Sequence, residues 1–125
     1  MAMGHEIEER KREEVVAELR ALGLSTYEAL TFYALANHPE MTAADLCKET
    51  GIPDSKIYHT LAGLEERGMI AIQRTRPSLY RVMKPGEAMS NLSRRLEEDH
   101  RQKLKGLERT ASKLEALYEH VANRE

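Results

Sequence analysis

The stretch TAADLCKETGIPDSKIYHTLAGLEERGMIAIQRTRPSLYRVMK, residues 42–84, carries two helical patterns followed by an alternating one. Residues 43–50 predict a short helix that Thr42 can cap and that Gly51 ends, because glycine tolerates a left-handed turn. A second helix is predicted over residues 54–67, and its buried stripe recurs at helical spacing. The stripe consists of Ile57, Leu61 and Leu64. A short helix, a glycine turn and a second helix are typical of a helix-turn-helix.

After Gly68 the period of the sequence changes from helical to alternating. Residues 69–84 predict two short strands around a turn at residues 75–78. This segment is basic and contains no acidic residue. Its cations are Arg74, Arg76, Arg81 and Lys84. A basic hairpin after a helix-turn-helix predicts a winged helix-turn-helix with a two-stranded β-wing.

The second helix is the predicted recognition helix of this fold, the helix that enters the major groove of DNA. We expect short or hydrogen-bonding side chains opposite its apolar stripe to approach the base edges of a duplex. These residues are Ser55, Lys56, His59, Thr60 and Gly63. Wing residues Arg74, Arg76 and Arg81 are expected to contact phosphates. The whole chain has a pI near 6.2, but residues 54–85 hold six basic and three acidic residues, a local net charge of +3.

The segments before the helix-turn-helix also predict helices. Residues 6–22 form a charged helical pattern that Gly23 can end. Ser25 and Glu28 have capping-box spacing and start the next helix, which ends before Pro39.

Residues 87–123 predict one helix of about 37 residues, near 55 Å long at 1.5 Å per residue. One stripe follows it at steps of three and four, with strict heptad spacing from residue 104 to residue 121. Two consecutive steps of four form a stutter, which tends to place its middle residue, His100, at a coiled-coil axis. The stripe comprises Met89, Leu92, Leu96, His100, Leu104, Leu107, Ala111, Leu114, Tyr118 and Val121.

A stripe of this length is too large for a small winged domain to cover alone, so we expect a homodimer in which these helices pair. The pattern leaves open whether they run parallel or antiparallel. The alternative is a helix that folds back on its own domain.

Several functional classes find no support in the sequence. No apolar run approaches the roughly 18–20 residues of a membrane span, and the N-terminus does not resemble a secretory signal. The single cysteine, Cys47, is expected to be a small core residue in a reducing cytosol. No HxxxH pair, nucleotide-binding loop or catalytic constellation is present. We therefore expect neither an enzyme, nor a bound metal, nor a cofactor, and the sequence identifies no small-molecule effector.

Residues 22–70, LGLSTYEALTFYALANHPEMTAADLCKETGIPDSKIYHTLAGLEERGMI, resemble the N-terminal domain of the TrmB-like transcriptional regulators, which are mostly archaeal. The resemblance covers about 65 residues with the wing. Its most specific parts are Gly51-Ile52-Pro53 and Ser55-Lys56-Ile57-Tyr58. It implies a winged-helix fold and sequence-specific DNA binding by Ser55, Lys56, Tyr58 and their neighbours.

The chain also departs from the pattern of this family. His59 and Ala62 stand where relatives often have an acid and a base, so a base preference does not carry over. Larger relatives continue into a sugar-binding effector domain, which we do not expect in a chain of 125 residues.

The sequence thus predicts a mainly helical protein with three parts. Residues 1–23 form an N-terminal helix that contributes to a dimer interface, residues 24–85 the winged helix-turn-helix, and residues 86–125 the dimerisation helix. The predicted function is sequence-specific binding of double-stranded DNA by a homodimeric transcriptional regulator in the cytoplasm, associated with the nucleoid. The alternative is a winged-helix module that docks an acidic protein surface.

Overall fold

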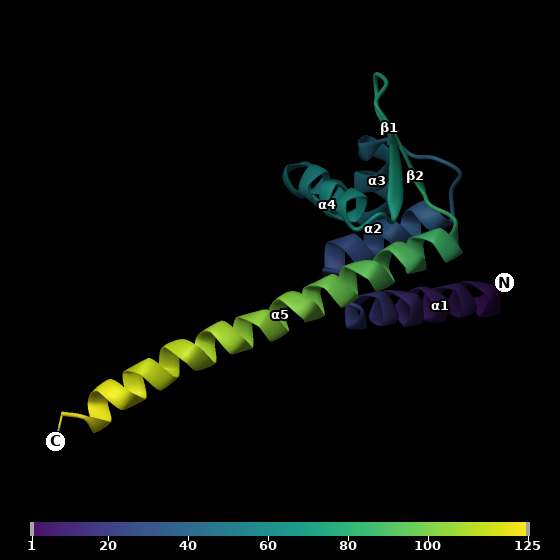
Figure 1. Ribbon diagram of the computed structural model, residues 1–125. Helices are drawn as coiled ribbons and strands as arrows, with labels where there is room; N and C mark the ends of the chain where they lie inside the picture. The colour runs from purple at the N-terminus through teal and green to yellow at the C-terminus, as the bar shows by residue number, and fades with distance from the viewer. Residues whose placement is uncertain (1, 125) are drawn as a thin grey trace. The chain divides into compact units, whose positions relative to one another are not determined.

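The computed structural model describes the backbone of residues 2–124 and, except for Ala2, Met3 and His5, their side chains. The elements follow in the order α1 (Ala2–Ala21), α2 (Thr26–Ala36), α3 (Ala43–Thr50), α4 (Asp54–Glu66), β1 (Ile70–Gln73), β2 (Leu79–Val82) and α5 (Pro85–Ala122) (Figure 1). This order confirms the predicted winged helix-turn-helix with a two-stranded wing and a long C-terminal helix.

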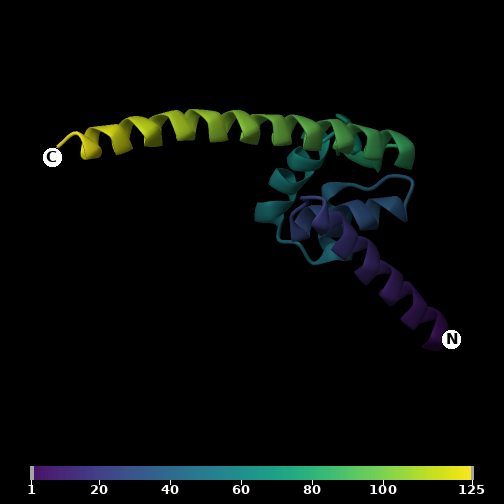
Figure 2. The ribbon, with the colours of Figure 1, turned by 60° about the horizontal axis from the view of Figure 1, so that its bottom comes forward.

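The chain divides into two compact units, the first ending at Leu92 and the second beginning at Ser93. Helix α5 is continuous (Figure 2), and its residues 85–92 belong to the first unit. The first unit thus includes about the first two turns of α5, whereas the sequence analysis divides the chain after residue 85. The second unit is the remainder of α5.

The first unit is built around one apolar core to which all of its helices contribute. Apolar side chains from α2, α3 and α4 form its centre, where Leu35, Leu46 and Leu64 are fully buried. Helix α1 packs against α2, with Leu19 buried and Val15 half-buried. The predicted stripe of α4, Ile57, Leu61 and Leu64, lies entirely within this core.

The wing is anchored to the helices by a third extended segment. Strands β1 and β2 pair antiparallel, with Ile70 opposite Val82 and Gln73 opposite Leu79. Met41, just before α3, forms a bridge to Tyr80, in which each backbone N–H donates to the carbonyl of the other, at 3.0 and 2.8 Å. The loop of the hairpin projects away from α2 (Figure 1). The sequence analysis did not predict the bridge between Met41 and Tyr80.

The predicted capping box opens α2 and also reaches α4. Glu28 accepts a hydrogen bond from the backbone N–H of Ser25 at 2.8 Å, and its other carboxylate oxygen lies 3.2 Å from Nε of Arg67. A terminal nitrogen of Arg67 donates to the carbonyl of Gly23 at 3.1 Å. A Cβ on Gly63 would lie 2.5 Å from the Glu28 carboxylate. Glycine at position 63 therefore gives the carboxylate room to reach Arg67.

The start of α5 is tied to the end of α4 and is part of the core. The side-chain amide of Asn91 donates to the carbonyl of Gly68 at 2.6 Å. Gly68 has a φ of +73°, and a Cβ there would meet Asn91 at 2.8 Å. Ala88 and Leu92 are buried on the adjacent face. Leu92 was predicted to contact a second copy, but it is 1% exposed because it fills the core of its own domain.

The part of the chain that the structure describes contains neither a helix suited to span a membrane nor a cluster of metal-ligating side chains. Within that part no helix combines the length and apolar character that a membrane span requires. The same residues contain no group of three or more His, Cys, Asp or Glu side chains placed to hold a metal ion.

The Glu28–Arg67 pair predicts a measurable stability difference. Glu28→Gln removes the charge that faces a largely buried guanidinium, and we expect the free energy of unfolding to fall by about 2 kcal/mol in urea denaturation at fixed protein concentration. The matched control is Glu65→Gln, which removes an exposed pair with Arg74 and should change stability by less than about 1 kcal/mol. Equal effects of the two substitutions would contradict the assignment.

Candidate nucleic-acid interface

Helix α4 exposes one face along its length. Ser55, Lys56, Tyr58 and His59 are exposed, as predicted for four of the residues proposed to contact DNA. Ala62 lies on the same face, three residues beyond His59, and is also exposed. The helix thus presents small and hydrogen-bonding side chains around one aromatic ring, with Tyr58 64% exposed.

Two residues predicted for this face lie elsewhere. Thr60 is 5% exposed, because its position between Ile57 and Leu64 belongs to the buried stripe. Its hydroxyl donates to the carbonyl of Lys56 at 2.9 Å, which satisfies the polar group inside the core. Gly63 faces Glu28 of α2. The prediction took small, polar residues to be outward-facing and so misplaced both.

Some cations of the wing are paired with a carboxylate and others are not. Arg74, just after β1, contacts both carboxylate oxygens of Glu65 on α4, at 3.2 and 3.3 Å. Within residues 2–124, the side chains of Arg76 and Arg81 take part in no ion pair or hydrogen bond. Arg76 lies in the loop between the strands and Arg81 on β2, and both are exposed. Among the described residues, Arg76 and Arg81 therefore carry positive charge that no carboxylate neutralises.

Aromatic side chains connect α4 to the wing. Burial raises the pKa of the Tyr80 hydroxyl, the nearby hydroxyl of Tyr58 raises it further, and the Arg74 guanidinium opposes both effects. The Tyr58 hydroxyl therefore lies near Tyr80 of the wing, while most of the Tyr58 side chain remains accessible to solvent. The contact between one Arg74 nitrogen and both Glu65 carboxylate oxygens also links the wing to α4.

The turn between α3 and α4 is held by backbone geometry and by side-chain contacts, among them the Thr50 hydroxyl, which accepts from the backbone N–H of Ile52 at 3.2 Å. Gly51 ends α3 in the left-handed conformation, with φ 76°, as its position in the sequence predicted. Thr42 caps α3 and forms a capping box with Asp45. Partial burial raises the pKa of the Cys47 thiol, and a hydrogen bond to the Asp54 carboxylate adds to this effect. The thiol thus joins α3 to the first residue of α4.

The second unit carries most of the stripe predicted for dimerisation. Its large apolar residues are 40–71% exposed: Leu96, Leu104, Leu107, Leu114, Tyr118 and Val121. His100 and Ala111 are exposed on the same helix, and Leu117, which the prediction omitted, is 60% exposed. Met89, at the start of α5, is 39% exposed.

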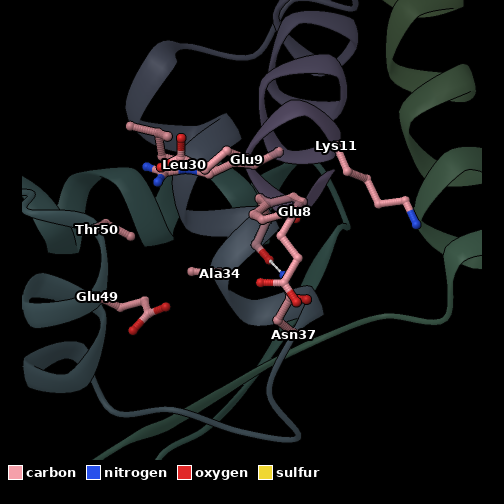
Figure 3. A pocket seen from close by; sticks show the side chains of 10 residues that line it. Glu8, Glu9, Lys11, Leu30, Ala34, Asn37, Glu49 and Thr50 are labelled. Atoms are coloured by element: carbon pink, nitrogen blue, oxygen red, sulfur yellow. Dashed lines mark hydrogen bonds between the residues drawn. The ribbon is translucent and has the colours of Figure 1, made fainter. Parts of the chain in front are cut away.

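A groove of about 560 Å³ lies on another part of the first unit (Figure 3). Residues of α1, α2 and α3 line it, and none belongs to α4 or the wing. Glu8 and Glu49 stand on opposite walls, and the side-chain nitrogen of Lys11 points away from both (Figure 3). The groove is therefore separate from the residues that the sequence proposes for DNA.

The sequence and fold of this chain match known regulators. Residues 19–86 match the family model described as sugar-specific transcriptional regulator TrmB. The HTH-type sugar sensing transcriptional regulator TrmBL1 of Pyrococcus furiosus is 30% identical over 113 residues, which are 90% of this chain and 31% of that protein. The chain thus spans about a third of the length of this curated relative.

Solved structures give the same architecture. The structure of TrmBL2, described as an archaeal chromatin protein with a novel mode of DNA binding, superimposes with a TM-score of 0.75. It is 23% identical and covers 91% of this chain and 46% of that chain. The transcriptional regulator Tm0710 from Thermotoga maritima has a TM-score of 0.54 at 18% identity, covering 94% of this chain and 88% of that one.

The Cys47–Asp54 contact predicts a pH dependence. Because the pKa of the native thiol is raised, alkylation by iodoacetamide should reach its half-maximal rate at a higher pH than in the urea-unfolded protein. Asp54→Asn should move this midpoint down, since it removes the carboxylate charge, but not fully to the unfolded value, since burial remains. Identical midpoints for native and unfolded protein, followed by mass spectrometry, would contradict the contact.

Proposed function

Because the chain belongs to the TrmB family of transcriptional regulators, we propose that it binds double-stranded DNA through α4 and the wing. The carrying observation is the pairing of an exposed α4 face with a hairpin whose Arg76 and Arg81 are free of carboxylates. In winged helix-turn-helix proteins the second helix enters the major groove. The description of TrmBL2 as a DNA-binding chromatin protein supports the same partner for this chain.

The exposed face of α4 is proposed to supply the sequence-reading contacts. Ser55, Lys56 and His59 can donate or accept hydrogen bonds at base edges, and the methyl group of Ala62 can pack against a thymine methyl. Lys56 lies near the N-terminus of α4, where a phosphate is also favoured. Thr60 and Gly63 are withdrawn from this set, because Thr60 is buried in the core and Gly63 faces the Glu28 side chain.

The wing is proposed to bind the DNA backbone. Arg76 and Arg81 can approach phosphates without first breaking an intramolecular ion pair, whereas Arg74 is engaged by Glu65. Contacts to phosphate fix the register of a protein on the duplex but do not themselves read sequence. We therefore assign Arg74 to holding the wing against α4, and Arg76 and Arg81 to affinity.

We further propose that the protein acts as a homodimer. The second unit is a single helix with an exposed apolar stripe, and burial of each large side chain stabilises an association by roughly 1.5 kcal/mol or more. A twofold dimer presents two reading helices, which is how helix-turn-helix regulators bind paired half-sites.

Substitution of the wing cations tests the backbone assignment. Arg76→Ala should weaken binding to every duplex and reduce the slope of log K against log salt by about one unit for each phosphate that the wing no longer neutralises. Arg20→Ala, an exposed arginine at the end of α1, is the matched control and should leave the slope unchanged. A slope that Arg76→Ala does not alter, measured by fluorescence anisotropy, would remove Arg76 from the interface.

Substitution on α4 tests the reading face. His59→Ala should lower affinity for a selected site by about 1–3 kcal/mol while leaving affinity for random duplex nearly constant. Thr60→Val, which keeps the shape of a buried residue, should leave the site preference unchanged. A loss of preference in Thr60→Val with no loss in His59→Ala would reverse the assignment of the two faces.

A further inference from the structure

We propose that the α5 helices of two copies pair antiparallel about a twofold axis at His100. This inference rests on the proposed homodimer and goes further by giving the direction and register of pairing. It follows from three features of α5: the spacing of its exposed stripe, the sizes of the side chains in that stripe, and the charges on its two flanks.

The exposed stripe reads the same in both directions from His100. Because Leu92 is buried in its own domain, the exposed position in that turn is Ser93, which extends the stripe at helical spacing. The stripe then advances in steps of 4, 3, 4, 4, 3 and 4 residues. Its members are Met89, Ser93, Leu96, His100, Leu104, Leu107 and Ala111. An antiparallel copy centred on His100 meets this pattern with an identical one, position by position.

Side-chain sizes are complementary in this register. Leu96 lies opposite the partner's Leu104, and both are exposed in the single chain, at 40% and 48%. The small Ser93 lies opposite the partner's Leu107, which is 66% exposed and therefore has apolar area to bury. Alternation of large and small residues across an interface lets two helices interdigitate.

The charged flanks are complementary as well. At 100° per residue, Glu97 and Arg101 lie on one flank of the stripe, and Asp99 and Lys103 on the other. A perpendicular twofold axis places each flank against the same flank of the partner. Glu97 then lies about two residues along the axis from the partner's Arg101, and Asp99 lies equally close to the partner's Lys103. With symmetry this gives four attractive pairs around His100, against two like-charge pairs, Asp99 and Arg101 each with its own counterpart in the partner.

The intrahelical contacts of the single chain do not oppose this arrangement. Arg95 lies 3.9 Å from Asp99, and Arg101 lies 2.6 Å from Glu98. Both pairs are solvent-exposed, and such pairs contribute only about 0.3–0.5 kcal/mol each. They can be exchanged for contacts across the interface at small free-energy difference.

Two other arrangements are less favourable on the same criteria. An antiparallel pair centred on the heptad segment 104–121 places Glu108 beside the partner's Glu115, twice by symmetry, with like charges opposed. A parallel pair in register gains one kind of complementary contact, Lys103 with the partner's Glu108, and sets the small Ala111 opposite itself; His100 lies opposite itself in both directions of pairing.

Disulfide crosslinking of two variants tests the register. In a Cys47→Ser background, Leu96→Cys and Leu104→Cys chains are prepared with tags of different mass and oxidised alone and mixed. The antiparallel register brings residue 96 of one chain within disulfide reach of residue 104 of the other. We expect the mixture to form the mixed disulfide and neither variant to crosslink with itself.

The other outcomes are equally informative. Self-crosslinking of each variant alone would establish parallel pairing and overturn the proposal. Absence of any crosslink in a protein that sediments as a dimer would place the interface elsewhere. That outcome would also overturn the proposal. A monomer in sedimentation would instead contradict the homodimer of the proposed function. His100→Cys, which lies opposite itself in either direction of pairing, is expected to self-crosslink and is the positive control for disulfide formation.

Discussion

The ion pair between Glu28 and Arg67 is the constraint that sets the rest of the winged domain. One carboxylate caps α2 and at the same time reaches the end of α4, passing over a glycine whose missing Cβ leaves the space. Arg67 then extends to the carbonyl of Gly23. Two segments far apart in sequence, residues 23–28 and residues 63–67, are fixed to one another by this contact. The inner face of α4 is thereby defined, and its outer face is left for a ligand.

The opposite side of α4 is organised by the wing. One terminal nitrogen of Arg74 contacts both carboxylate oxygens of Glu65 and connects the hairpin to the helix, and the Tyr58 hydroxyl lies near Tyr80. Met41 completes the small sheet from the other side. The hairpin therefore stands in a defined place beside α4, and within the described part of the chain no carboxylate neutralises its Arg76 and Arg81. Affinity and sequence preference are thus expected from different elements that one core holds together.

The sequence predicted those parts that follow from periodicity and from local chemistry. The stripe of α4, the capping box at Ser25 and the left-handed Gly51 were all confirmed, because each depends on residues within one or two helical turns. The residues it misplaced depend on contacts across the fold. Thr60 is polar yet buried, since its hydroxyl bonds to its own helix, and Leu92 fits the dimer stripe yet fills the core. Helical spacing from Ile57 and Leu64 would have placed Thr60 on the buried face.

The exposed stripe of the second unit depends on which residues of α5 the winged domain buries. Burial of Leu92 transfers the exposed stripe to Ser93, and only then does the pattern become symmetric about His100. We propose above all that the two winged helix-turn-helix domains of a homodimer bind one duplex. Selection from a random duplex pool with the purified full chain tests it most directly. The account predicts enrichment of two inverted copies of a short motif at a fixed spacing. Recovery of unenriched sequence, with no retention of duplex at low ionic strength, would contradict it.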